Sequence, residues 1–252
     1  MGNNEPREDI YQDPLTPFGP LDTVVSLSTW PLALAQMGAW LPLFTLLDRF
    51  FIPGKDIDRL ARVACRLGTL SVGIRVQVQG QERFAPGQAY VIAFNHVSLL
   101  DTPVLVQAVP VYCRTFQEMG HRKIPVYGSF VRLMGQLPVQ QGNRQLNEAS
   151  YAGALEMLRA GKSFGVFPEG HRTRDGRLGR FYPGGFRLAI EAGVPVIPAV
   201  TRGLRNLCPA KEWRMRPGRV EDSLGEPVRT DGLTQDDTDD LANQVRGEMN
   251  LL

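Results

Sequence analysis

Short apolar runs alternate with segments of helical periodicity along most of the chain, and this alternation most constrains the fold. Strand-like runs lie at 71–78, 90–94, 111–116, 136–140, 163–167 and 196–201, and helices are predicted near 99–109, 126–134, 146–159 and 185–192. Such runs pair in parallel by default, through right-handed crossovers. The sequence therefore predicts an α/β fold with a mostly parallel central sheet flanked by helices, and 252 residues are enough for one sizeable core.

A histidine stands directly after one of these apolar runs, in the stretch Asn95-His96-Val-Ser98-Leu-Leu-Asp101. Open α/β sheets place their chemistry at the carboxyl ends of the strands. The aspartate falls in the first turn of the next predicted helix, where its carboxylate can hold the imidazole in one tautomer, as a general base requires. A core histidine bonded to a helix-capping aspartate would give the same pattern, so this stretch alone leaves both interpretations open.

A second polar turn follows a later apolar run and reads Pro168-Glu169-Gly170-His171-Arg172. Glycine allows a close backbone approach, and arginine offers a charged fork of hydrogen-bond donors. A glutamate, a glycine and an arginine at a strand exit therefore suit an anionic or polyhydroxylated ligand.

Together the two turns resemble blocks of the glycerolipid acyltransferase superfamily, whose best-known bacterial members are the lysophosphatidate (1-acylglycerol-3-phosphate) acyltransferases. The Asn-His-four-any-Asp block is intact, and so is the Phe-Pro-Glu-Gly-x-Arg block at 167–172, with His171 where threonine is usual. A late Val-Pro-Val-Ile-Pro block lies at 194–198. The remaining block, at 135–144, has Gln141 where the family usually has an arginine. Four motifs in order form a specific signal, whereas each alone is weak.

The resemblance implies direct acyl transfer from acyl-CoA or acyl carrier protein to a lysolipid hydroxyl, with no other cofactor and no metal. The commonest acceptor in the family is 1-acylglycerol-3-phosphate, which gives phosphatidate. His96 is expected to be the base, with Asp101 orienting it and stabilising its cationic form. Ser98 is explained equally well as a helix cap, and Asn95 as a residue that shapes the turn. The expected substrate-binding residues are Asn95, Ser98, Phe167, Pro168, Glu169, Gly170, Arg172 and Arg144.

Two departures from the family pattern bear on the acceptor. Phe116 stands where the family commonly has a lysine, and Gln141 replaces the arginine noted above. Both family cations are aimed at phosphate, and a hydrogen bond to a charged group weakens when one charge is removed. A different lysolipid, or an amphiphilic alcohol without phosphate, therefore remains an open alternative. The residues that could compensate from a shifted backbone are Arg114, His121, Arg122 and Arg144.

The amino-terminal part predicts attachment to a membrane. Residues 23–47 carry no charge, include Trp30 and Trp40, and are numerous enough to span a bilayer. Pro31 and Pro42 make this run a poor span, and no cationic cluster flanks its start. Tryptophan prefers the level of the lipid headgroups, which favours a helix lying in one leaflet.

The following segment, 56–67, has amphipathic helical spacing, with arginines along one side and apolar residues along another. An ordinary helical hairpin packed on the core would give the same pattern. We predict a monotopic or peripheral protein at the cytoplasmic face of the membrane, with membrane-associating helices within residues 1–69 and an acyltransferase domain in residues 70–252. Three widely spaced cysteines fit reduced thiols of the cytoplasm.

Charge is unevenly distributed, although the net charge is only +2. Residues 171–219 contain eleven Lys and Arg against three acids, and residues 220–252 contain nine acids against two arginines. A basic middle of this kind suits anionic headgroups, so the lipid bilayer is an expected partner. The basic residues lack a recognised motif and regular aromatic interleaving, so no nucleic acid partner is expected.

Two rival functions come from other classes. A metal-dependent hydrolase would use His96, Asp101, His121 and His171, but these lack the close pairs of ligands that are typical of zinc sites. A catalytically silent membrane-surface protein predicts a broken His-Asp pair, and the pair in this chain is intact.

Overall fold

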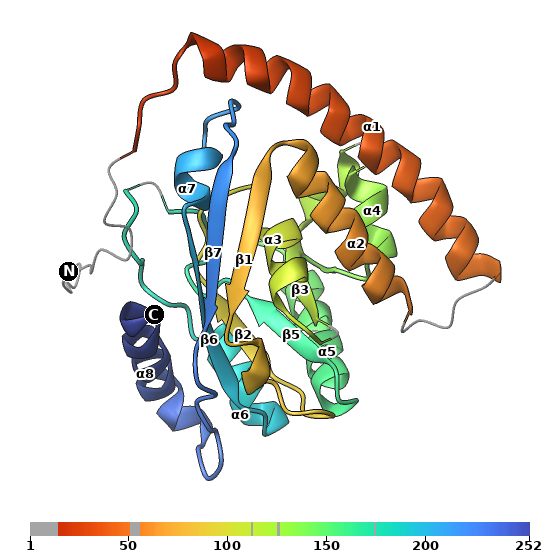
Figure 1. Cartoon of the computed structure of the whole chain (residues 1–252). Coiled ribbons are helices and arrows are strands. Elements are labelled where there is room, and N and C mark those ends of the chain that lie inside the picture. The colour runs from red at the N-terminus through yellow and green to blue at the C-terminus, as the bar shows by residue number, and fades with distance from the viewer. Residues whose placement is uncertain (1–14, 51–55, 112, 125–126, 174) are drawn as a thin grey trace.

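A seven-stranded sheet forms the centre of the protein (Figure 1). The computed structural model describes residues 15–50, 56–111, 113–124, 127–173 and 175–252. In spatial order the strands are β1 (Ile74–Gln79), β7 (Gly218–Leu224), β6 (Val196–Arg202), β2 (Val91–Phe94), β5 (Ser163–Val166), β3 (Cys113–Glu118) and β4 (Leu137–Val139). Neighbouring strands pair in parallel, except that β6 and β7 pair antiparallel. The predicted α/β fold with a mostly parallel sheet is confirmed.

Helices cover both faces of this sheet. The described α-helices are α1 (Pro20–Phe50), α2 (Asp56–Ser71), α3 (Asp101–Ala108), α4 (Tyr127–Leu133), α5 (Arg144–Arg159), α6 (Gly184–Ala192), α7 (Leu204–Leu207) and α8 (Thr238–Leu251). Short 3-10 turns are η1 (Gln81–Arg83), η2 (Met119–Lys123) and η3 (Gln235–Asp237).

Strand β2 is buried on both sides, as expected of a central parallel strand. Val91 and Ala93 lie in a core cluster with residues of α5, α6 and α8. Ile92 and Phe94 lie in a second cluster, which includes Leu105 of α3. Because successive residues of a strand point to opposite faces, both faces of β2 must be apolar, which explains its continuous apolar run. The residues that follow β2 therefore lie at the carboxyl end of a central strand of the sheet.

Among the described strands, β7 is the one that the sequence pattern does not predict. Its inward side chains are Val220, Asp222 and Leu224, and the buried aspartate interrupts the apolar alternation. The predicted strands and helices of the α/β part are otherwise confirmed, with boundaries shifted by a few residues. Strand β1, for example, starts only at Ile74, because Gly73 turns the chain with a φ of +77°.

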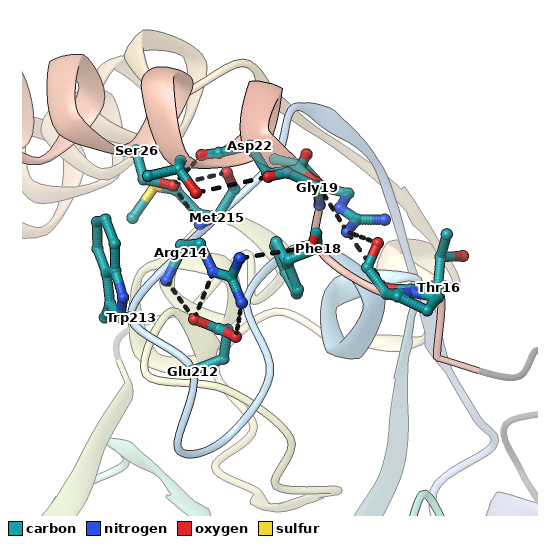
Figure 2. A network of polar contacts seen from close by, with 12 residues as sticks. Thr16, Phe18, Gly19, Asp22, Ser26, Glu212, Trp213, Arg214 and Met215 are labelled. Atoms are coloured by element: carbon teal, nitrogen blue, oxygen red, sulfur yellow. Dashed lines mark hydrogen bonds and ion pairs between the residues drawn. The ribbon is translucent and has the colours of Figure 1, made fainter.

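Helix α1 is fastened near its amino terminus by the loop that precedes β7 (Figure 2). The Oγ of Ser26, a fully buried side chain, donates to the carbonyl of Met215 (3.1 Å) and accepts from its N–H (2.8 Å). The guanidinium of Arg216 donates to Asp22 (3.1 Å) and lies 4.0 Å from the ring centroid of Phe18. These contacts join segments that are 189 or more residues apart in the sequence, so α1 packs on the sheet domain and extends along α2 and α4 (Figure 1).

Helix α2 contacts both α1 and α3, and an ion pair joins it to the sheet. Arg114 of β3 places a guanidinium nitrogen 2.6 Å from the carboxylate of Asp58, with both side chains largely buried. Ala61 and Ala64 of α2 are buried, whereas Leu67 stays 43% exposed. The second amino-terminal helix therefore has both a packed side and an exposed apolar side.

The uncharged run of the sequence is helical throughout, including Pro31 and Pro42. None of the helices in the described part of the chain is both long enough and apolar enough to cross a membrane. Many large apolar side chains of α1 and α2 are exposed: Leu21, Val24, Leu27, Leu32, Leu34, Leu43, Leu46, Val63, Leu67 and Leu70.

Candidate active site

His96 and Asp101 meet at the carboxyl end of β2. The strand ends at Phe94 and α3 begins with Asp101, so the turn between them brings the two side chains together. Nδ1 of His96 lies 2.5 Å from Oδ2 of Asp101. The same oxygen accepts hydrogen bonds from the N–H groups of Val97 (2.8 Å) and Ser98 (2.9 Å). Because a carboxylate only accepts, Nδ1 carries the proton and Nε2 keeps a free lone pair.

The second polar turn holds His96 from another side. The ring of Phe167 stacks on the imidazole, with centroids 4.3 Å apart, and the N–H of Thr173 donates to the His96 carbonyl (2.8 Å). Gly170 makes this turn possible, because its φ is +67° and an added Cβ would lie 3.0 Å from the ring of Tyr182. The His96 side chain remains 25% exposed, so a substrate can reach its free nitrogen.

Glu169 lies behind the histidine. Its Oε1 accepts from the N–H of His96 (2.9 Å), and its Oε2 accepts from the N–H of Gly179 (2.9 Å). The side chain is buried, and burial raises the pKa of the Glu169 carboxyl, an effect that the two backbone donors partly oppose. Through these two hydrogen bonds Glu169 positions the turn that carries His96. This arrangement gives no support to the expected contact between Glu169 and the substrate.

A buried polar network on β6 and β7 lies next to the His-Asp pair. The side chain of Asn95 exchanges two hydrogen bonds with the backbone of Thr201 (3.0 and 2.8 Å), which agrees with a turn-shaping role. The hydroxyl of Thr201 in turn donates to Asp222 (2.6 Å). Burial raises the pKa of Asp222 to about 7, and the charge of Asp101 adds to the rise. The sequence pattern does not indicate Asp222, because this residue belongs to β7, the strand that the pattern does not predict.

A cavity of about 790 Å³ opens beside His96. The predicted site residues that line it are His96, Ser98, Phe167, Pro168, Gly170 and Arg172. Asn95 and Glu169 are buried outside its lining. Arg144 also lies outside it: this side chain is 91% exposed and bonds Glu148 (2.6 Å) in a neighbouring surface depression. The structure therefore brings together most, but not all, of the expected substrate-binding residues.

Other side chains from neighbouring strands and helices complete the lining, and the sequence pattern does not indicate which of them face the cavity. Phe116, Val139 and Val166 give it apolar surface from three neighbouring strands, and Tyr151 adds a ring from α5. Such surface suits an acyl chain. The apolar runs signal these strands, but which side chains face the cavity depends on pleat and strand order. Within the described residues, no group of three or more His, Cys, Asp or Glu side chains is placed to hold a metal ion.

The model of the Acyltransferase family matches residues 75–202, which are 128 of the 252 residues. The chain belongs to the acyltransferase family. Among relatives of this acyltransferase, the 1-acyl-sn-glycerol-3-phosphate acyltransferase alpha of Mus musculus is 33% identical over 206 residues, which cover 79% of this chain and 71% of the mouse protein. The Ovis aries protein of the same name is 32% identical over 182 residues, which cover 70% of this chain and 62% of the sheep protein. The chain thus spans less than two thirds of the sheep protein.

A solved structure shares the fold of this acyltransferase. It is the crystal structure of the 1-acyl-sn-glycerophosphate (LPA) acyltransferase PlsC from Thermotoga maritima, with a TM-score of 0.75 and 22% identity. The match covers 90% of this chain and 95% of that one. The predicted membership of the acyltransferase family is confirmed.

Proposed function

We propose that this acyltransferase transfers a fatty acyl group to the free hydroxyl of a lysolipid, with 1-acylglycerol-3-phosphate as the acceptor and phosphatidate as the product. The donor is acyl-CoA or acyl carrier protein. One observation carries the reaction type: the imidazole of His96 is fixed by Asp101 and presents its free nitrogen to an open cavity. The names of the mouse and sheep relatives support the acceptor.

The geometry supports a direct transfer without an acyl-enzyme intermediate. Nε2 of His96 takes the proton of the acceptor hydroxyl while the oxygen attacks the thioester carbonyl. Asp101 stabilises the imidazolium that forms, through its 2.5 Å contact with Nδ1. When the tetrahedral intermediate collapses, the C–S bond breaks and the departing thiolate takes the proton back from His96. The products are the acylated lipid and the free thiol.

The cavity supplies both kinds of surface that such an acceptor needs. Arg172 lines it and carries a permanent charge for the phosphate, while Phe116 and Val139 offer apolar surface for the chain. Phe116 packs edge-on against Phe164, with ring centroids 4.7 Å apart, where the family commonly has a lysine. This loss of a cation is the observation that favours the second candidate, an amphiphilic alcohol or another lysolipid without the phosphate.

Exposed apolar side chains along α1 and α2 support attachment to one leaflet of a membrane. A lysolipid is held in the bilayer, so an enzyme that lies on its surface can take up the acceptor without extracting it into water. We place the protein, on this basis, at the cytoplasmic face of the membrane, where acyl-CoA and acyl carrier protein are found.

The test is mass spectrometry of the products formed from a panel of lysolipids and one phosphate-free monoacylglycerol, each supplied with acyl-CoA or acyl carrier protein. We expect phosphatidate from lysophosphatidate at the highest kcat/KM. His96→Ala is the matched control for background acyl transfer. Preferred acylation of an acceptor without phosphate would replace the first candidate by the second, and thioester hydrolysis without an acylated product would refute both.

A further inference from the structure

All three histidines of the chain line the same cavity, although the proposed mechanism uses only one of them. His96 is the base. His121 lies on η2, directly after β3, and His171 lies in the turn after β5. Two imidazoles thus face the substrate cavity without an assigned task.

The residues that could replace the missing family cations take very different positions. Arg114 is buried against Asp58 of α2. Arg122 donates to a backbone carbonyl 3.2 Å away, and Arg144 bonds a glutamate outside the cavity. Of this group, His121 is the member that lines the cavity. A compensating contact with the acceptor therefore falls to His121.

Hydrogen bonding leaves one nitrogen of His121 for a ligand. Its Nδ1 bonds the side-chain amide of the buried Gln117, and the ring of Tyr127 approaches edge-on, with centroids 6.0 Å apart. When the amide donates, the neutral imidazole carries its proton on Nε2. When the ring is protonated, the amide can turn its oxygen toward Nδ1 and Nε2 keeps its proton. His121 can thus donate to an anion in both states.

His171 has the opposite tautomer. Its Nδ1 donates to the carbonyl of Glu169, 2.6 Å away, because a carbonyl oxygen only accepts. The neutral ring therefore offers a lone pair at Nε2, whereas the protonated ring offers an N–H. Binding of an anion by His171 requires the protonated ring.

A permanent positive charge lines the same cavity as these two rings. Arg172 lines the cavity, and its charge opposes the rise that burial gives to the pKa of Tyr127, the residue whose ring meets His121. Within the described residues Glu118 is the one carboxylate in the lining, and it is solvent-exposed. The remaining titratable groups around the cavity are Tyr127, Tyr151, Tyr182, His96, Asp101 and Glu169. Cationic groups thus outnumber carboxylates in the lining once the imidazoles are protonated.

We propose that His121 and His171, together with Arg172, form a subsite for the phosphomonoester of the acceptor headgroup, and that this subsite strengthens as the two imidazoles are protonated. The inference rests on the proposed function, since it needs a phosphorylated acceptor. A protonated imidazole carries a positive charge and two N–H donors, whereas the neutral ring carries no charge, so affinity for the acceptor should be higher at acidic than at alkaline pH.

The first experiment measures kcat and KM for lysophosphatidate and for a monoacylglycerol at pH 6.0 and pH 8.5. The variants are His121→Gln, His171→Thr and the double variant, with Arg229→Gln as a control that removes an exposed cation outside the cavity. At pH 6.0 each single variant should raise the KM for lysophosphatidate roughly 10-fold and leave kcat nearly unchanged. At pH 8.5 the effect of His171→Thr should disappear. The ratio of variant to wild type at each pH cancels ionisation of the acceptor itself.

The KM for the monoacylglycerol should not change in any variant. An equal rise for both acceptors, a loss confined to kcat, or an effect of His171→Thr that does not depend on pH would overturn the subsite. Circular dichroism identifies a variant that fails to fold.

A second measurement does not need the variants or any turnover. With three histidines in the chain, imidazole NMR signals of the wild type can be followed through a pH titration with and without inorganic phosphate. Bound phosphate should raise the apparent pKa of two imidazoles, because an anion favours their charged form. Unchanged titration curves would overturn the subsite. If the wild type fails to acylate lysophosphatidate but the NMR shift is present, the acceptor assignment fails and the phosphate subsite stands.

Discussion

The carboxylate of Glu169 accepts a hydrogen bond from the backbone N–H of His96, a residue 73 positions earlier in the chain. Its other oxygen accepts from Gly179, so one buried side chain joins the turn after β2 to the loop after β5. Glu169 therefore fixes the positions of these two loops relative to each other.

Replacement of Glu169 by Gln should lower kcat. The amide retains one acceptor but places an N–H₂ group against one of the two backbone donors, which leaves a buried donor unpaired at a cost of about 1–3 kcal/mol. We expect a lower thermal midpoint and a lower kcat, with little change in the KM for the acceptor. Glu156→Gln, at an exposed position of α5, is the control. A rise in KM with an unchanged kcat would instead mean that Glu169 contacts the acceptor.

His96→Ala should reduce transfer by about 10²-fold or more, because it removes the general base. Asp101→Asn should reduce transfer by a similar factor, since the asparagine can no longer fix the imidazole tautomer or stabilise the imidazolium of His96. Product formation by purified, folded variants is the measurement. Wild-type turnover by His96→Ala would refute the mechanism.

Much of the fold can be predicted from the sequence, because the information is local. Apolar runs, periodicity and Gly193 at the end of α6 indicate where elements begin and end. Contact of His96 with Asp101 is likewise predictable, since five residues and one turn separate them.

The rest depends on strand order, which the pattern leaves open. Asp222 reaches the site only because β7 lies between β1 and β6 in the sheet. The polar side chain of Asp222 also interrupts the apolar alternation of β7, so the pattern does not predict this strand. The placement of Arg114 against Asp58 likewise depends on which face of β3 this residue joins, and the placement of His121 in the cavity depends on the η2 turn that follows β3.

Arg172→Ala should raise the KM for lysophosphatidate steeply. Removal of a charge-assisted contact costs roughly 1.5–3 kcal/mol, which corresponds to about a 10- to 150-fold change. The same change should have little effect on a phosphate-free analogue, and Gln141→Arg is expected to improve activity on lysophosphatidate because Gln141 lines the cavity. Steady-state kinetics with both acceptors measures these changes in KM. Equal losses would show that Arg172 does not recognise phosphate.

Charges introduced on the exposed apolar side of α1 should weaken attachment to liposomes. Leu27 and Leu34 are 63% and 50% exposed, and burial of each in lipid contributes up to about 1.5–3 kcal/mol. The double variant Leu27→Glu, Leu34→Glu should remain in the supernatant when vesicles sediment, whereas Leu251→Glu, on α8, should not differ from wild type. Co-sedimentation of the double variant at the wild-type level would refute the predicted attachment through α1.

Deletion of residues 1–68 should also release the protein from liposomes, but the structure makes this a harsher test. The deletion eliminates Ser26, which bonds the backbone of Met215, and Asp58, which pairs with Arg114. Buried polar groups of the sheet domain therefore lose these partners. The substitutions retain those contacts, so they separate loss of the lipid-facing surface from loss of folding.

Asp222 should make the stability of the protein depend on pH. Its pKa is about 7 in the folded protein and 3.8 in an ordinary environment, chiefly because of burial. Between these values the folded state holds one more proton than the unfolded state, so the free energy of unfolding falls as the pH rises from about 4 to about 7, by up to about 4 kcal/mol, and then levels off. Asp222→Asn does not titrate, and its amide oxygen can still accept from Thr201. Relative to the wild type, this variant should therefore gain stability as the pH rises through that range.

Urea unfolding at a series of pH values measures this difference, with Asp237→Asn as a control of opposite sign. Hydrogen bonds from Thr234 lower the pKa of Asp237, so its contribution is present above the ordinary aspartate value and is lost only on acidification. Relative to the wild type, Asp237→Asn should therefore lose stability as the pH rises from about 3 to 5. Parallel stability curves for the wild type and Asp222→Asn would show that folding does not raise the pKa of Asp222.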